Sequence, residues 1–424
     1  MKEKRNSTPE NEVVEKKDKP KQIKDLYESF INNITSVEVF FKRLAPVAEN
    51  EDKAIEKEKG EYLEKSMKEI FGDDFEKEEK EEKKEFKISE NDLNKFLYKM
   101  ELAPRIPAKN YGTLTKGAFI MLNNYFEFLF SDLLAYNFKK NTSSIDGKKI
   151  SISLEDLKKY ISIEEAYDDL IYKEVEALLL ELNFEELKAY FSIKLNISLE
   201  LDLINWEFIN EIRERRHIII HNNSIVNNKY LTRTKNHFKY KLNDEVKINH
   251  EYFINALNEI KLAGVLLCLN CWGSWDKDNT TRAIEEIVNI SFYDLKEAKY
   301  DFVHKICAYT EKNIKARNDE EDDIIYRIKF NHCIALKRLN KKEELTKKLT
   351  TIKTGALSPI FKIAHLTLKD KHKDAVDLFD KAKVADELTI DKYNDWPIFH
   401  DIRNDEKLHK KAIEAFEKNS IANT

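Results

Sequence analysis

The residues best suited to chemistry lie in one short segment, which reads WEFINEIRERRHIIIHNNSIVNNKY over positions 206–230. At about 100° per residue, a helix here would place Arg213, His217 and His221 on one face. Arg216 would stand about 60° from Arg213 and about 140° from His221, so a shared site needs a cleft at the helix end. A neutral imidazole can remove the proton of a ribose 2′-hydroxyl, and a guanidinium can stabilise the charge that builds on the phosphate. The segment therefore predicts cleavage of RNA without a metal.

A basic stretch follows these residues. No Asp or Glu occurs between Arg215 and Asn243, although the whole chain carries a net charge of -5. Because cations and aromatic rings alternate along this stretch, it predicts a local surface that binds phosphates and stacks bases. The residues expected to bind RNA or its phosphates are Arg213, Arg215, Lys229, Tyr230, Arg233, Lys235 and Lys239.

Other constellations in the chain are weaker. His217 and His221 have the spacing of a zinc pair, but Ile218 stands where a metalloprotease carries its Glu. Cys268 and Cys271 lie in an apolar run, which favours buried structural thiols, and no glycine-rich phosphate loop occurs. We therefore expect neither a metal nor a cofactor. In the structural alternative, the arginines and histidines of segment 206–230 only complement the dipole at the C-terminal end of the helix.

The run Arg216-His217-Ile218-Ile219-Ile220-His221 resembles the motif of HEPN ribonucleases, which is Arg, a polar residue, three variable residues and His. The resemblance extends over about residues 93–285. It implies a homodimeric helical bundle in which two motifs form one cleft, with Arg216, His221 and His217 as catalytic residues. Such enzymes cut RNA without a metal and leave a 2′,3′-cyclic phosphate. Many are toxins or abortive-infection effectors against phage.

Three further positions bear on this resemblance. His217 occupies the polar place that is most often Asn in the family, so either histidine could be the principal base. Asn223 stands where one toxin branch carries a Tyr, so regulation by tyrosine modification is not expected. Glu127, on an earlier helix, could orient a motif residue or be a surface carboxylate. Some HEPN proteins have lost catalysis, so the alternative function is a non-catalytic dimerisation module that binds RNA or protein.

The composition favours an all-α fold. Only 8 Gly and 7 Pro occur in 424 residues, too few for a turn-rich β protein or a glycine-punctuated α/β enzyme. Apolar residues recur every three or four positions in several segments. Helices are expected over 23–44 with Pro46 after the end, over 115–138, over 154–193 with breaks at Ser162 and Asn183, over 203–220 and over 250–272.

Four parts are expected along the chain. They are a disordered tail (1–20), an N-terminal helix and charged linker (21–92), the HEPN-like bundle (93–285) and α-solenoid hairpins that resemble tetratricopeptide repeats (286–424). The partners expected are tRNA or mRNA, a second copy of the chain, and a protein on the C-terminal hairpins. No apolar run reaches about 18 residues and the N-terminus lacks a signal-peptide core, so we expect a cytoplasmic protein without a membrane partner.

Overall fold

The computed structural model describes residues 22–71, 89–102, 108–141, 151–199, 201–352 and 357–417. Within these ranges the fold is all-helical, with one isolated antiparallel bridge between Ile225 and Glu245 in place of any strand. The predicted all-α class is confirmed. The longer helices are α1 (Ile23–Phe71), α3 (Glu90–Leu102), α4 (Asn110–Lys140), α6 (Ile163–Glu181), α7 (Phe184–Lys194), α8 (Trp206–His221), α10 (His250–Trp275), α11 (Thr280–Lys296), α12 (Tyr300–Asn313), α13 (Asp319–Arg338), α14 (Lys342–Thr351), α15 (Pro359–Leu368) and α20 (Glu406–Glu417). The short ones are α5 (Leu154–Leu157), α9 (Asn228–Arg233), α16 (His372–Val376), α17 (Phe379–Val384), α18 (Ile390–Asp395) and α19 (His400–Arg403).

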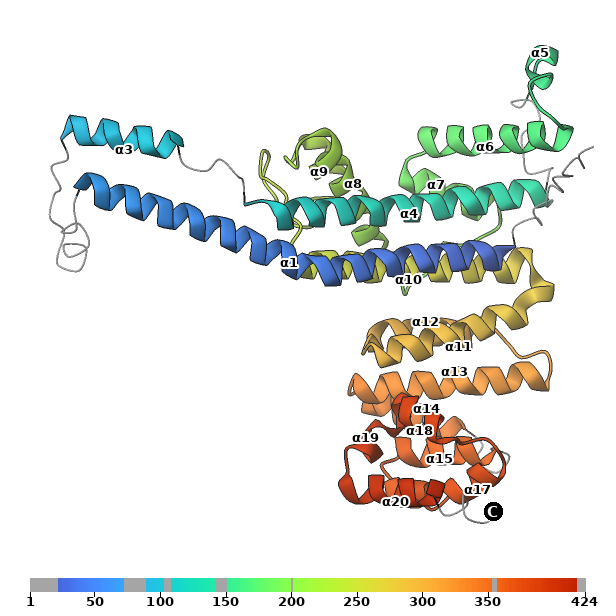
Figure 1. Cartoon of the computed structure of the whole chain (residues 1–424). Coiled ribbons are helices and arrows are strands. Elements are labelled where there is room, and N and C mark those ends of the chain that lie inside the picture. Colours follow the sequence, from blue (N-terminus) through green and yellow to red (C-terminus); the bar gives the residue numbers. More distant parts are fainter. Residues whose placement is uncertain are drawn as a thin grey trace, which may run out of the picture.

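Three long helices, α1, α4 and α10, form the centre of the N-terminal half and run side by side (Figure 1). Their apolar stripes meet in the core, because residues three and four positions apart share one helical face. The expected helices over 115–138 and 250–272 are confirmed as α4 and α10. Helix α6 packs on α4, and α8 packs on both α4 and α10.

Helix α1 is much longer than the sequence predicts. The expected end before Pro46 is wrong, since the helix continues to Phe71. Pro46 is exposed, so the carbonyl that loses its partner faces water, while Ala45 and Ala48 still pack inward. Asp52, six residues further, accepts hydrogen bonds from the first amides of α4, Asn110 N at 2.8 Å and Tyr111 N at 2.9 Å. These contacts stabilise a helix that continues beyond the proline.

The two breaks expected between residues 154 and 193 are confirmed. Ser162 caps α6 and accepts a hydrogen bond from the amide of Glu165. Asn183 caps α7 and forms a reciprocal capping box with Glu186. These caps satisfy amides that the first helical turn leaves without partners.

Helix α10 is the most buried of the long helices. At Gly264 it approaches α1 so closely that a Cβ atom would lie 2.2 Å from the ring of Phe30. Among the described residues, α10 is the single helix long and apolar enough to span a membrane, but most of that stretch is buried inside the protein. Both features are typical of a core helix.

Below α10, helices α11, α12 and α13 form the next layer, and α14 to α20 lie beyond them (Figure 1). The layers are joined by a buried ion pair in which Lys261 of α10 contacts both carboxylate oxygens of Asp294 on α11, at 2.7 and 2.9 Å. Lys299 links the same carboxylate to Glu38 of α1. One hydrophobic core therefore extends from α1 to α20, and α11 runs across the residue 285 boundary expected from the sequence.

Candidate functional site at the end of α8

Helix α8 carries the motif residues and is held on three sides. Asn205 caps its first turn, and its buried face contains Ile209 and Ile212, which pack in the main core. The helix contacts α4, α9 and α10. The expected helix over 203–220 is confirmed, and it ends at His221.

The arginines Arg213 and Arg216 face α4 and share one carboxylate. Glu127 of α4 places Oε1 3.6 Å from Arg213 Nη2 and Oε2 3.7 Å from Arg216 Nη2. Arg216 Nη2 also donates to Asn124 Oδ1 at 3.1 Å, and the Arg213 guanidinium lies over the ring of Phe184, 4.6 Å from its centre. The two guanidinium groups are therefore fixed in orientation by side chains of other helices.

Burial lowers the pKa of Arg213, and the nearby Glu127 carboxylate opposes that effect. A guanidinium keeps its charge even when partly desolvated. The positive charge here is only partly compensated, because two arginines share a single carboxylate and both remain partly exposed. A phosphate would complete the balance.

The two histidines lie next to each other on α8. The centres of the His217 and His221 rings are 4.8 Å apart, and His221 is exposed. Burial lowers the pKa of His217, and the cations Lys229 and Arg233 of α9 contribute to the same shift. His217 is therefore neutral at pH 7, as a general base must be.

Within one chain, the arginines and the histidines do not meet. Among the described residues, neither histidine makes a hydrogen bond or ring contact with Arg213 or Arg216. Arg213, His217 and His221 share one face of α8 as expected, but Phe184 and Glu127 hold the Arg213 side chain toward α4 and α7. An active site that uses both the arginines and the histidines therefore needs a further surface that brings the substrate to both.

Arg215 and Tyr230 are not on the surface, so their predicted contacts with RNA are wrong. Each side chain is 1% exposed. Arg215 Nε donates to the buried Glu211 carboxylate at 2.6 Å, and its guanidinium lies 3.7 Å from the ring centre of Tyr252. The hydroxyls of Tyr230 and Tyr252 donate to the same carboxylate. Burial raises the pKa of both tyrosines, so their hydroxyls stay protonated and act as donors.

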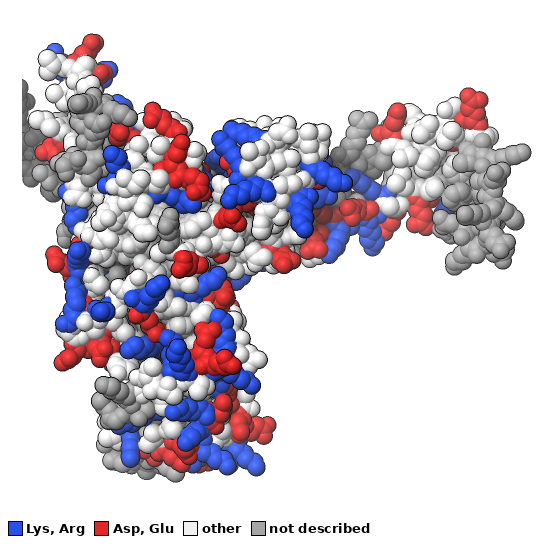
Figure 2. All heavy atoms as spheres, turned by 180° about the vertical axis from the view of Figure 1, so that it is seen from behind, with Lys and Arg blue, Asp and Glu red and all other residues white. Residues whose placement is uncertain are grey.

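The remaining predicted cations are exposed and form a basic surface around α9, defined by Lys229, Arg233, Lys235 and Lys239. Figure 2 shows Lys and Arg side chains gathered over this part of the molecule. Arg233 pairs with Glu214 at 2.9 Å and Lys235 with Glu207 at 3.2 Å. Lys229 and Lys239 have no ion pair within the part of the chain that the structure describes.

Glu127 and Asn124 are the contacts that sequence reasoning left unresolved or missed. The sequence allows two roles for Glu127, orienting a motif residue or being a surface carboxylate. Its contacts with both arginines favour the orienting role. Asn124 gave a weak signal, as one of two adjacent asparagines in an otherwise apolar stretch of α4. Neither could be paired with α8 from spacing, because about 90 residues separate them along the chain.

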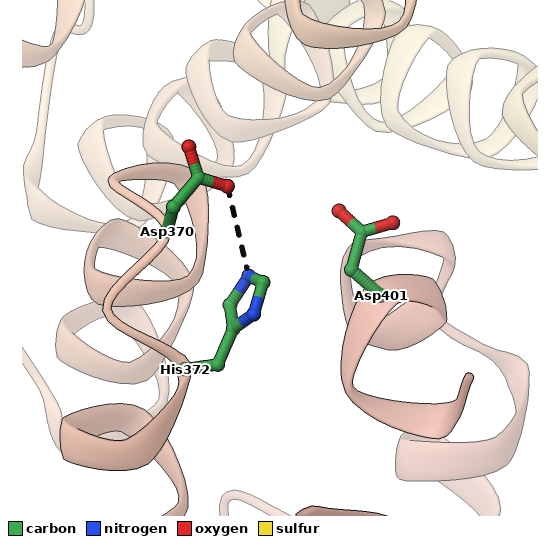
Figure 3. Close-up of side chains that lie close together, drawn as sticks. All are labelled: Asp370, His372 and Asp401. Carbon is green, nitrogen blue, oxygen red and sulfur yellow. Dashed lines mark ion pairs between the residues drawn. The ribbon is translucent and has the colours of Figure 1, made fainter. Parts of the chain in front are cut away.

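One cluster has the composition of a metal site. Asp370, His372 and Asp401 bring their ligand atoms within 4.8 Å of one another, and Figure 3 shows Asp370 and His372 paired with Asp401 opposite them. Lys337 already lies 2.8 Å from Asp370 and 3.2 Å from Asp401, and Arg338 lies 2.8 Å from Asp401. Two cationic side chains therefore neutralise the two carboxylates, and the arrangement is an ion-pair network.

A second cluster is a directed chain of hydrogen bonds between α12, α13 and α14. The Lys341 ammonium can only donate, so at 2.9 Å it leaves His304 Nε2 as the acceptor. His304 Nδ1 then donates to His332 Nε2 at 2.8 Å, and His332 Nδ1 donates to Glu311 at 2.7 Å. Lys348 binds the other Glu311 oxygen at 2.5 Å. The chain is complete only while both imidazoles are neutral.

We expect this chain to make stability depend on pH. Burial lowers the pKa of His304 and of His332 in the folded protein, whereas a histidine of the unfolded chain has a pKa of about 6.5. The unfolded state therefore binds more protons as pH falls below that value, and the free energy of unfolding decreases. Chemical denaturation between pH 7.5 and 5.5 measures the slope, which should be shallower in His304→Gln and His332→Gln. His400→Gln, at an exposed histidine, should keep the full slope; equal slopes in all variants would contradict the expectation.

All four cysteines are buried free thiols, which confirms the structural assignment of Cys268 and Cys271. Burial raises the pKa of both groups, so neither is a thiolate at neutral pH. Thiol chemistry therefore does not compete with the end of α8 as the candidate site.

The geometry at the end of α8 is the basis for assigning a function to the chain. Its features are two arginines fixed by α4, an exposed imidazole beside a neutral one, and a basic surface next to them. A scan against protein-family models and searches of curated proteins and of solved structures gave no match to the chain.

Proposed function

We propose that the end of α8 is the active site of a metal-independent endoribonuclease of the HEPN type. The observation that carries the proposal is the fixed arginine pair, Arg213 and Arg216, on the same helix as the exposed His221. Anchored guanidinium groups can bind phosphate with little loss of conformational freedom. The basic surface around α9 would hold the rest of the RNA strand.

In the proposed reaction, a neutral imidazole accepts the proton of the 2′-hydroxyl, and that oxygen attacks the adjacent phosphorus. The bond from phosphorus to the 5′-oxygen breaks, and a second, protonated imidazole gives that oxygen its proton. The products are a 2′,3′-cyclic phosphate and a 5′-hydroxyl. His221 and His217 are the imidazoles, and Arg216 stabilises the charge on the phosphate oxygens. Arg213 assists phosphate binding.

The proposed enzyme is a homodimer, because Arg216 and His221 lie about 140° apart around α8 and make no direct contact with each other among the described residues. An apolar stripe on α4 offers a surface for the second copy. Met121 and Phe128 are 42% and 56% exposed, and Tyr125 lies between them. Glu127, the residue before Phe128, holds the two arginines. Pairing through this stripe would bring the motif of one chain toward that of its partner.

Replacing Phe128 by Ser should weaken the dimer about tenfold, because loss of a central aromatic contact costs at least about 1.4 kcal/mol. Sedimentation velocity over a concentration series measures the change. Val384→Ser, at a side chain 81% exposed on α17, is the matched control and should leave association unchanged. A monomeric wild type, or equal dissociation constants for wild type and Phe128→Ser, would remove the stripe from the proposed interface.

The proposal is tested by incubating purified protein with labelled tRNA and mRNA in EDTA. Cleavage that yields 2′,3′-cyclic phosphate ends is the expected result. The second candidate, a non-catalytic module, is favoured by the exposed basic surface alone. It predicts salt-dependent RNA binding without cleavage. We also propose that the protein acts in the cytoplasm as a toxin or antiphage effector. The C-terminal helices are proposed to form hairpins of an α-solenoid.

A further inference from the structure

The C-terminal layers enclose a groove that the proposed nuclease does not use. It has a volume of about 740 Å³ and lies between α11, α13, α15 and α18. Its apolar surface includes Phe292, Tyr293, Phe361 and Trp396. Tyr293 is 65% exposed, although large aromatic side chains are normally covered. The groove therefore has the aromatic anchoring surface of a binding site.

The rim of this groove is acidic. Five carboxylates line it, from Asp323, Asp386, Glu387, Asp391 and Asp395, against two cations, Arg327 and Lys392. This excess of negative charge disfavours nucleic acid and favours a cationic ligand.

Not all of that charge is compensated within the chain. Arg327 pairs with Asp323 at 2.9 Å, and Lys296 from outside the groove pairs with Asp395 at 3.0 Å. Asp386 and Asp391 are exposed and have no ion pair among the described residues. Two free carboxylates thus stand beside an apolar floor.

A second cavity extends the same surface. It has a volume of about 640 Å³, lies between α1 and α11, and shares Asn289 and Tyr293 with the groove. A ligand that covers Tyr293 could continue into this cavity. The shared residues favour a chain-like ligand over a compact small molecule.

We propose that the groove binds a basic peptide segment of a partner protein, in which Lys or Arg residues flank a large apolar side chain. The apolar side chain packs against Phe361 and Trp396, and the cations pair with Asp386 and Asp391. This inference is independent of the proposed nuclease activity, because none of the groove residues lies on α4, α8 or α9. It gives the C-terminal layers a recognition role.

The test is fluorescence anisotropy with three dye-labelled peptides and the full chain. The probes are KLFRKLWK, its acidic counterpart ELFEELWE, and KSGRKSGK, which keeps the charge without apolar side chains. The first should bind, with an affinity that falls as salt rises, and the other two should bind at least about tenfold more weakly. Similar affinity for the first and third peptides would overturn the role of the aromatic floor.

The double variant Asp386→Lys with Asp391→Lys should weaken binding of the first peptide at least about tenfold. Its matched control is Asp374→Lys with Asp380→Lys, which makes the same change at exposed positions of α16 and α17 and should bind as wild type does. Equal affinities for both double variants would overturn the proposal. The affinity of a labelled RNA for wild type and for the Asp386→Lys, Asp391→Lys variant is measured as well. Tighter RNA binding by the variant supports the charge argument. Weaker RNA binding by the variant would assign the groove to nucleic acid.

Discussion

Replacing His221 or Arg216 by alanine is expected to lower the rate of RNA cleavage at least about a hundredfold, the usual effect of removing a general base or a group that stabilises the transition-state charge. His221 is exposed at the helix end, so its loss removes one of the two proposed proton-transfer groups without opening a cavity. Arg216 is fixed by Asn124 and Glu127, and its loss would remove the proposed phosphate contact. Initial rates on labelled tRNA and mRNA in EDTA are the measurement.

Two control variants separate catalysis from folding. His400→Ala and Arg282→Ala remove exposed side chains of the same types from α19 and α11, and both should keep the wild-type rate. Arg216→Lys keeps the charge but loses the planar fork that binds two phosphate oxygens, so it should recover only part of the rate. Wild-type rates in both His221→Ala and Arg216→Ala would refute the assignment of the active site.

Binding of RNA should survive these changes. The exposed cations Lys229 and Lys239 lie outside the proposed catalytic set, and in the proposal they contact phosphates without regard to sequence. Affinity of His221→Ala for RNA should therefore stay close to wild type and decrease with salt. If binding and cleavage are lost together, His221 acts on RNA binding or folding and not as a proton-transfer group.

Helix positions were largely predictable because each depends on a local pattern. The apolar period located α4 and α10, and the polar residues Ser162 and Asn183 marked real helix starts. The error at Pro46 has a physical reason. A proline removes one hydrogen bond, but packing of Ala45 and Ala48 and the contact of Asp52 with α4 compensate for it. These tertiary contacts have no signature in the local sequence.

The basic stretch shows a different limit. A run of cations is normally solvated, and that expectation is correct for Lys229, Lys235 and Lys239 but fails for Arg215. Its partner Glu211 lies just before the stretch, four residues earlier on the same helix. The spacing was visible, but burial of the pair depends on rings from Tyr252 and other distant residues. Sequence alone could suggest the ion pair, not the cover above it.

The buried carboxylate of Glu211 supports the second large effect. Replacing Glu211 by Ala should lower the free energy of unfolding by about 3–5 kcal/mol, because it leaves a buried guanidinium without its counter-charge. Glu211 and Arg215 are each 1% exposed, and the hydroxyls of Tyr230 and Tyr252 lose the same acceptor. Burial opposes the charge on Arg215, yet contacts with Tyr252 and Glu211 keep its pKa above the usual value. Urea denaturation followed by circular dichroism measures the loss.

A matched variant on the same helix shows that burial, not charge alone, causes this effect. Glu207 pairs with Lys235 where both side chains are largely exposed, so Glu207→Ala should change stability little. The double variant Glu211→Leu with Arg215→Met should be more stable than Glu211→Ala, because it removes the charge that the single change strands. If Glu211→Ala is as stable as Glu207→Ala, the Glu211 carboxylate does not hold α8 in place through its bonds to Tyr230 and Tyr252. The position of the motif would then depend on the contacts of α8 with α4, α10 and the main core, and Glu127→Ala would become the decisive variant for orienting Arg213 and Arg216.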